Sequence, residues 1–133
     1  MRQLFTQIMV YTGFATLFLS CKTEPNCHEI IGRWTNREGK MLYFKPDGQA
    51  LWLTKFGSQY DTFFVKYHLD CTLKQPTLDL LDFHAGPLEG KTLFGIIEWS
   101  NDSVFRFEAE PGTSPEARPI QFNAQQIERF YRL

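Results

Sequence analysis

The chain has 133 residues and a formal net charge of −1, and 43% of its residues are hydrophobic. This length is enough for one domain with one hydrophobic core and too short for two. The hydrophobic content excludes a disordered chain. The near-neutral charge, without a basic cluster, argues against a nucleic-acid-binding protein, because such a protein must neutralise phosphates.

The first twenty residues differ in character from the rest. No charged side chain occurs from Gln3 to Ser20, and Arg2 precedes this apolar stretch. The stretch is short and interrupted by polar residues, which is more typical of a secretory signal peptide than of a membrane span. We therefore expect residues 1–20 to be a signal peptide; an uncleaved anchor helix is the alternative.

A small residue stands directly before a cysteine in the segment Phe18-Leu-Ser-Cys21. The segment resembles the lipobox of bacterial lipoproteins, in which the cysteine is linked to diacylglycerol and becomes the mature N-terminus. The resemblance implies lipidation of Cys21, a short tether at residues 21–26 and a folded domain at residues 27–133. It also places the domain in the bacterial cell envelope, and Lys22 favours the outer membrane, facing the periplasm or the cell surface.

Cleavage would leave 113 residues, with thirteen Lys and Arg against fifteen Asp and Glu. With Cys21 lipidated, Cys27 and Cys71 remain as an even pair in an oxidising compartment, which predicts a disulfide. The alternatives are two buried free thiols and a metal site with His68 and Asp70. His68 and Asp70 share one strand face and Cys71 the other, so the ligand set is incomplete. We expect neither a metal nor a cofactor.

Short runs of alternating apolar and polar residues, separated by turn residues, continue from residue 32 to the end of the chain. This pattern is typical of antiparallel β-strands, and Pro46-Asp-Gly48 is a strong hairpin-turn signal. We expect no helix longer than a turn. The predicted strands cover residues 32–35, 40–45, 49–54, 60–69, 77–83, 92–99, 104–109 and 127–133.

Eight strands joined in order by short turns predict an all-β fold, a small antiparallel up-and-down barrel. Closure into a barrel removes the exposed edges of such a sheet. A sandwich is the alternative, but it needs longer crossovers than these turns provide. The longest connections are His84–Gly90 and the polar loop Glu110–Arg118. Gly95 interrupts a predicted strand, and we expect a bulge or a barrel corner there.

Residues at the two ends of the domain suggest how the barrel closes. Gly32-x-Trp34 on the first strand and Arg132 on the last strand resemble the signature of the lipocalin superfamily. The resemblance implies that Trp34 closes one end of the barrel and that Arg132 packs across its ring. A guanidinium over an indole contributes about 0.5–2 kcal/mol. Arg129 is the alternative partner if the register differs.

Several short motifs from Pro76 to Phe122 occur in an order that resembles a second group, the uncharacterised planctomycete-type lipocalin-like family. The resemblance extends from Ile31 to Arg132 and implies a secreted or lipid-anchored barrel without an established activity. Ile97 departs from that family's pattern, as does the long loop before Arg118. The motifs are Pro76-Thr-Leu-Asp-Leu80, Gly90-Lys-Thr92, Gly95-Ile96, Asn101-Asp-Ser-Val104 and Arg118-Pro-x-x-Phe122.

The sequence contains no recognisable catalytic motif. No Ser-His-Asp set accompanies a Gly-x-Ser-x-Gly elbow, and no glycine-rich phosphate loop follows a strand. Asp79 and Asp82 are three residues apart on one predicted strand, so they face opposite sides and cannot act as an acid–base pair. We expect a monomeric, non-enzymatic protein.

Two non-catalytic functions fit this composition. In the first, the barrel interior holds a small apolar ligand. In the second, a packed barrel acts as a protein-interaction module of the envelope, such as a scaffold, an inhibitor or an immunity-type lipoprotein. Arg118 is expected to pair with Asp79 or Asp82, to cap a barrel mouth, or to bind a ligand carboxylate. The candidate ligand or partner contacts are Trp52, Phe63, Phe105, Phe107 and Arg118.

Overall fold

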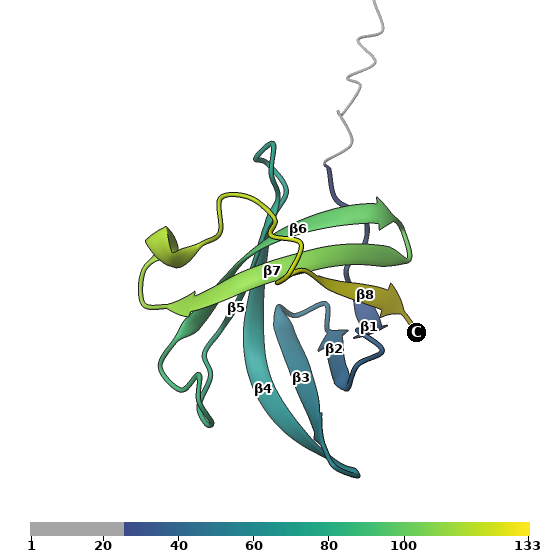
Figure 1. Cartoon of the computed structure of the whole chain (residues 1–133), viewed down its shortest axis with the longest axis vertical. Coiled ribbons are helices and arrows are strands. Elements are labelled where there is room, and N and C mark those ends of the chain that lie inside the picture. Colours follow the sequence, from purple (N-terminus) through teal and green to yellow (C-terminus); the bar gives the residue numbers. More distant parts are fainter. Residues whose placement is uncertain (1–25) are drawn as a thin grey trace, which may run out of the picture.

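The computed structural model describes residues 26–133, so the predictions for the signal peptide and for Cys21 lie outside the described residues (Figure 1). Within this part of the chain, no helix is long and apolar enough to cross a membrane. The elements are β1 (Gly32–Thr35), β2 (Lys40–Phe44), β3 (Gln49–Phe56), β4 (Gln59–Asp70), β5 (Thr77–Leu81), β6 (Thr92–Asn101), β7 (Val104–Gly112), the short 3₁₀ helix η1 (Pro115–Ala117) and β8 (Glu128–Arg132).

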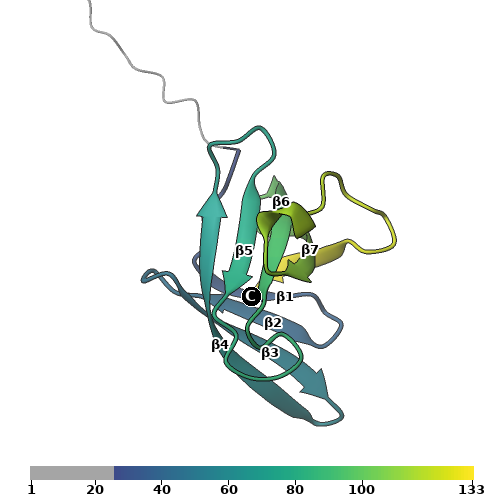
Figure 2. The same cartoon turned by 90° about the vertical axis from the view of Figure 1, so that its left-hand side faces the viewer.

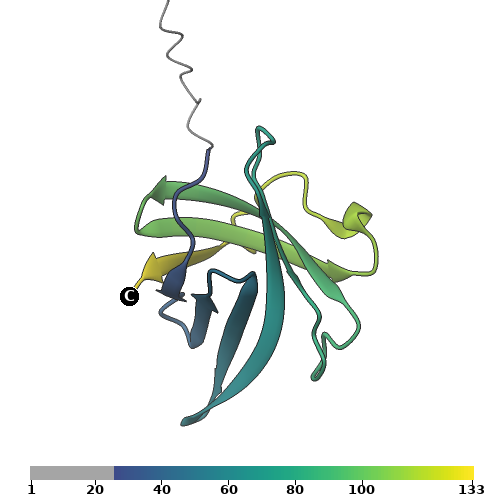
Figure 3. The same ribbon diagram turned by 180° about the vertical axis from the view of Figure 1, so that it is seen from behind.

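The strands form a closed antiparallel barrel in which each strand pairs with the next one along the chain. The last strand returns to the first, and Trp34 is the register partner of Arg132. Both the all-β class and the up-and-down barrel predicted from the sequence are confirmed. Figures 1 and 3 show the two sides of the barrel, with β1–β4 curving away from the layer that β6 and β7 form.

The bounds of seven of the eight predicted strands differ from the structure by one to three residues, as at the fifth and seventh strands. The fifth strand ends at Leu81 rather than at residue 83, because Asp82 adopts a left-handed backbone with φ of 61°. The expected loop at residues 110–118 instead continues β7 to Gly112 and then forms η1. β8 pairs with β7 only as far as Phe107, so Pro111 lies where that side of the strand is unpaired. A missing backbone N–H is tolerated at such an edge.

The two ends of the barrel differ. At the closed end, where β1 begins and β8 ends, Trp34 is fully buried and its Nε1 donates to the carbonyl of Ile30 at 2.8 Å. Phe105 is also fully buried, with its ring centroid 4.6 Å from that of Trp34 and 5.3 Å from that of Phe130. This end of the interior is therefore packed with aromatic rings.

Arg132 covers the closed end from outside. Its guanidinium carbon lies 4.3 Å from the ring centroid of Trp34, which is the contact expected from the sequence. The guanidinium also donates to the carbonyls of Glu29, Ile31 and Asp102. A Cβ at position 32 would lie 3.1 Å from Arg132 Nη1, and Gly32 has a φ of +128°. The glycine thus gives the strand this backbone and leaves room for the arginine.

The structure has no bulge at Gly95, one of the two features that the sequence predicts there. The pairing of β6 with β5 and β7 is continuous there, and the irregularity in β6 lies between Trp99 and Asn101. A Cβ on Gly95 would lie 2.2 Å from Phe107 Cε2 and 2.6 Å from the carbonyl oxygen of Leu78. The ring of Phe107 occupies the space of the missing side chain, an arrangement known from other sheets.

The disulfide between Cys27 and Cys71 is confirmed, with an S–S distance of 2.01 Å and a Cα–Cα distance of 5.9 Å. It joins the start of the described chain to the residue after β4, at the closed end. Beside it, the hydroxyl and backbone N–H of Thr72 donate to Asp70 Oδ1 at 2.6 and 2.9 Å. These hydrogen bonds lower the pKa of the Asp70 carboxyl.

Candidate functional site: a cavity at the open end of the barrel

The open end of the barrel, where β3 and β5 end and β2 begins, holds a cavity of about 180 Å³. We call it the mouth cavity. Its wall is almost entirely apolar, and Lys40 is the one charged residue that lines it. The engineered apolar cavity that binds benzene measures about 150 Å³, so the mouth cavity matches a single-ring molecule. Its lining residues are Lys40, Trp52, Thr54, Phe56, Phe63, Phe83, Ala85, Pro87 and Leu88.

Alternation along β3 and β4 positions the aromatic wall of the mouth cavity. Trp52 and Phe63 are register partners on neighbouring strands, and both point inward, with ring centroids 6.5 Å apart. Phe83 meets Trp52 edge to face, with a centroid distance of 5.4 Å. Because Asp82 ends β5 with a left-handed residue, Phe83 leaves the sheet and still buries its ring.

The connection between β5 and β6 closes one side of the mouth cavity. In this connection a Cβ at position 86 would lie 2.9 Å from Phe63 Cε1, and Gly86 has a φ of +79°. Only a glycine therefore lets the loop pass this close to the ring. Leu88 from the same loop packs on the core. Figure 2 shows this loop beside the β3–β4 hairpin at the lower end of the barrel, away from the N-terminal end.

A second cavity of about 130 Å³, which we call the inner cavity, is more polar. Lys40 and Trp52 line both cavities, so these two side chains stand at the boundary between them. The other residues of the inner cavity are Leu42, Leu80, Leu93, Phe107, Ala109, Gln126, Glu128 and Phe130. The barrel is consequently packed at its closed end and contains these two cavities at its open end.

An ion pair lies at this boundary. Lys40 Nζ is 2.7 Å from Glu128 Oε1, and the two side chains are 32% and 34% exposed. Asn36 Nδ2 donates to the second carboxylate oxygen, Oε2, at 3.1 Å. The ammonium also lies 5.5 Å from the ring centroid of Trp52. Both partners are inward-facing residues of β2 and β8, which barrel closure brings together across β1.

The aromatic candidate residues from the sequence fall into three groups. Trp52 and Phe63 line the mouth cavity, and Phe107 lines the inner cavity. Phe105 lines neither, because it is buried in the closed end against Trp34. The expectation that Phe105 contacts a ligand is therefore not supported by its position, since the closed end is filled by rings.

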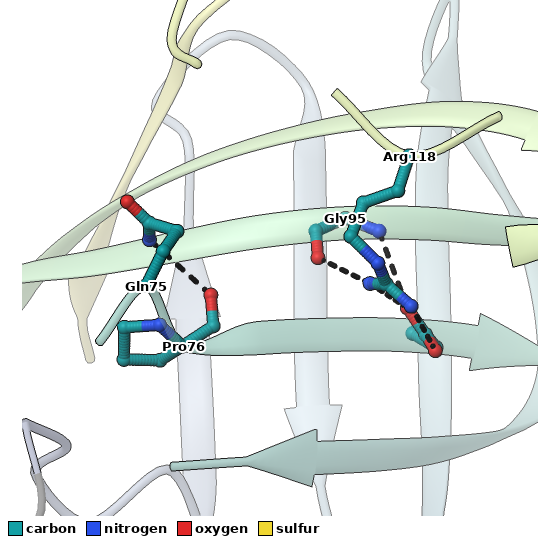
Figure 4. Close-up of polar contacts among 5 residues, drawn as sticks. Gln75, Pro76, Gly95 and Arg118 are labelled. Carbon is teal, nitrogen blue, oxygen red and sulfur yellow. Dashed lines mark hydrogen bonds and ion pairs between the residues drawn. The ribbon is translucent and has the colours of Figure 1, made fainter. Parts of the chain in front are cut away.

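Arg118 lies on the outer face of the barrel, so the interpretation as a mouth cap is wrong, whereas a contact with a ligand carboxylate stays a prediction. Its Nη1 and Nη2 bond to Asp79 Oδ1 and Oδ2 at 2.5 and 3.0 Å, and Nη1 also donates to the carbonyl of Gly95 at 2.7 Å (Figure 4). The expected pairing with Asp79 is thus present. It holds the segment after β7 against the outer face of β5 and β6, where Phe94 and Ile96 are buried.

Sequence reasoning missed Lys40, Glu128, Phe83 and Leu88 as site residues. Lys40 and Glu128 are 88 positions apart, and only the register of the closed barrel makes them neighbours. The one available signal was that both charged residues fall on the inward face of their strands.

Models of protein families, curated protein sequences and solved structures give no match to the chain.

Proposed function

We propose that this chain is a non-catalytic, lipid-anchored binding protein of the bacterial envelope, whose mouth cavity holds a small apolar ligand. The observation that carries the proposal is an apolar cavity of about 180 Å³, bounded by Trp52, Phe63 and Phe83, at the open end of a barrel whose closed end is packed. Natural ligand sites are concave and mostly apolar, with a few fixed polar groups. The Lys40–Glu128 pair supplies those groups here.

Toluene, a single-ring probe, tests this proposal. At a concentration ten times its Kd it should stabilise the fold by about 1.4 kcal/mol, which raises the Tm of a domain of this size by roughly 4–8 °C per kcal/mol. Thermal unfolding of the full chain with increasing toluene measures this effect. No saturable rise in Tm would contradict the proposal.

A pair of matched variants tests whether toluene binds in the mouth cavity. Thr54 faces inward and lines the mouth cavity, so Thr54→Phe should fill the cavity and abolish the toluene-dependent rise in Tm. Thr62 lies on the neighbouring strand and is exposed on the opposite face, so Thr62→Phe should keep the rise. An equal rise in both variants would place toluene outside the cavity.

The lipid anchor gives the cavity an orientation in this proposal. The tether between Cys21 and Cys27 has five residues and spans at most about 17 Å, and Cys27 is fixed at the closed end by its disulfide. The mouth cavity lies at the other end, so it would open away from the membrane. Cys21→Ala should release the protein from bacterial membranes into the soluble fraction. Retention of this variant in washed membranes would contradict lipidation.

A second candidate function rests on the β3–β4 hairpin. Phe56, Tyr60 and Phe64 are 63%, 46% and 70% exposed, and exposed aromatic side chains are enriched in protein interfaces. The hairpin is therefore the candidate contact surface of a chain that acts as a protein-interaction module of the envelope. Cross-linking from the hairpin to an envelope protein, lost in Phe64→Ser, together with no toluene binding, would favour this function over the first.

A further inference from the structure

The charged pair at the boundary of the two cavities restricts which ligand the mouth cavity accepts. Lys40 is the one charged residue in the otherwise apolar wall of the mouth cavity. An ammonium has three donor hydrogens, and Glu128 and the ring of Trp52 are its two partners in the structure. A hydrogen-bond acceptor on a bound molecule therefore has a donor available at this point.

The charge of Lys40 is already compensated. Glu128 Oε1 lies 2.7 Å from its Nζ, and Asn36 holds the other carboxylate oxygen in place. A ligand carboxylate would bring a second negative charge next to Glu128, against a single cation and inside an apolar wall. Burying a charge without its own partner is costly, and like charges at short distance repel. An anion is thus disfavoured even though a lysine lines the site.

A ligand cation is also disfavoured. The two groups that could bind it, the Glu128 carboxylate and the ring of Trp52, already contact Lys40. A molecule without polar groups would leave the donor of Lys40 unused and would displace any water bound there. A neutral molecule with one acceptor satisfies the donor and adds no charge. The cavity volume of about 180 Å³ fits an apolar part of one ring or an aliphatic group of similar size.

From this geometry we infer that the ligand is a small neutral molecule with one ring-sized apolar part and one hydrogen-bond acceptor, such as a carbonyl oxygen, directed at Lys40 Nζ. This inference rests on the proposed function, since it specifies the ligand of the same cavity. It makes the Lys40–Glu128 pair a determinant of specificity rather than only a contact between β2 and β8.

Three probes of similar size test the inference: acetophenone, benzoate and isopropylbenzene have the same number of non-hydrogen atoms. In NMR titrations of the full chain, acetophenone should bind at least about tenfold more tightly than isopropylbenzene, because a hydrogen bond to a charged group contributes about 1.5–3 kcal/mol. Benzoate should bind more weakly than acetophenone. Tighter binding of benzoate, or equal binding of acetophenone and isopropylbenzene, would overturn the inference.

Two variants separate the roles of the charges. Glu128→Gln removes the compensating charge and keeps the shape, so the affinity for benzoate relative to that for acetophenone should rise about tenfold or more. Lys40→Met removes the donor, so acetophenone should lose its advantage over isopropylbenzene. An unchanged benzoate affinity relative to that for acetophenone in Glu128→Gln would overturn this inference and leave the proposed function intact. If none of the three probes binds the wild-type chain, the proposed function fails as well.

Discussion

Replacement of Trp34 by alanine should cost about 3–5 kcal/mol of the free energy of unfolding. The side chain is fully buried, packs edge to face on Phe105 and donates to the carbonyl of Ile30. Its loss leaves a cavity at the closed end and removes the ring under the Arg132 guanidinium. The whole stability of a small domain is about 5–15 kcal/mol, so chemical denaturation should show a large shift of the midpoint.

Trp52 provides the matched control, because it is the same residue type in the hollow end of the barrel. It is only partly buried and lines the mouth cavity, so Trp52→Ala should destabilise less than Trp34→Ala. Trp34→Phe keeps a ring over which Arg132 can lie and should also cost less than the alanine variant. A Trp34→Ala protein as stable as the wild type would contradict the role assigned to barrel closure.

Removal of the disulfide should have the second largest effect on stability. The bridge spans 44 positions and ties residue 27 to the end of β4. Disulfides typically contribute about 2–4 kcal/mol, and the chain-entropy model gives about 4 kcal/mol for a loop of this length, so the double variant Cys27→Ala, Cys71→Ala should lose an amount in this range. Thermal unfolding with and without reductant measures the loss.

Reductant should lower the Tm of the oxidised wild type and leave that of the double variant unchanged. Because the bridge lies at the closed end and the mouth cavity at the other, toluene should still raise the Tm of a folded double variant. A wild type whose Tm is insensitive to complete reduction would contradict a stabilising role for the bridge.

The barrel could be predicted from the sequence because its signals are local. Alternation fixes which side chains face inward, as for Phe63 and Val65 against Phe64, and turns such as Pro46-Asp-Gly48 fix where strands end. The errors arose where distant contacts override local signals. Phe107 fills the space above Gly95, and Arg118 holds a segment that the sequence shows only as a polar loop.

The cavity could be predicted only in part. Inward-facing aromatic residues were visible in the alternation, but the sequence does not show which of them fill the barrel and which leave a space. Phe105 and Phe63 are both inward-facing phenylalanines; three rings surround the first, whereas the second faces a glycine of the β5–β6 loop. The Lys40–Glu128 pair requires the final register of β8, which no local pattern determines.

The measurement that tests the central claim most directly is an NMR map of where toluene binds the full chain. The account predicts saturable chemical-shift changes centred on Lys40, Trp52, Thr54, Phe63 and Leu88, with none around Trp34 and Phe105 at the closed end. Changes confined to the exposed tip of the β3–β4 hairpin, or no saturable change at all, would contradict a ligand-binding cavity at the open end of the barrel.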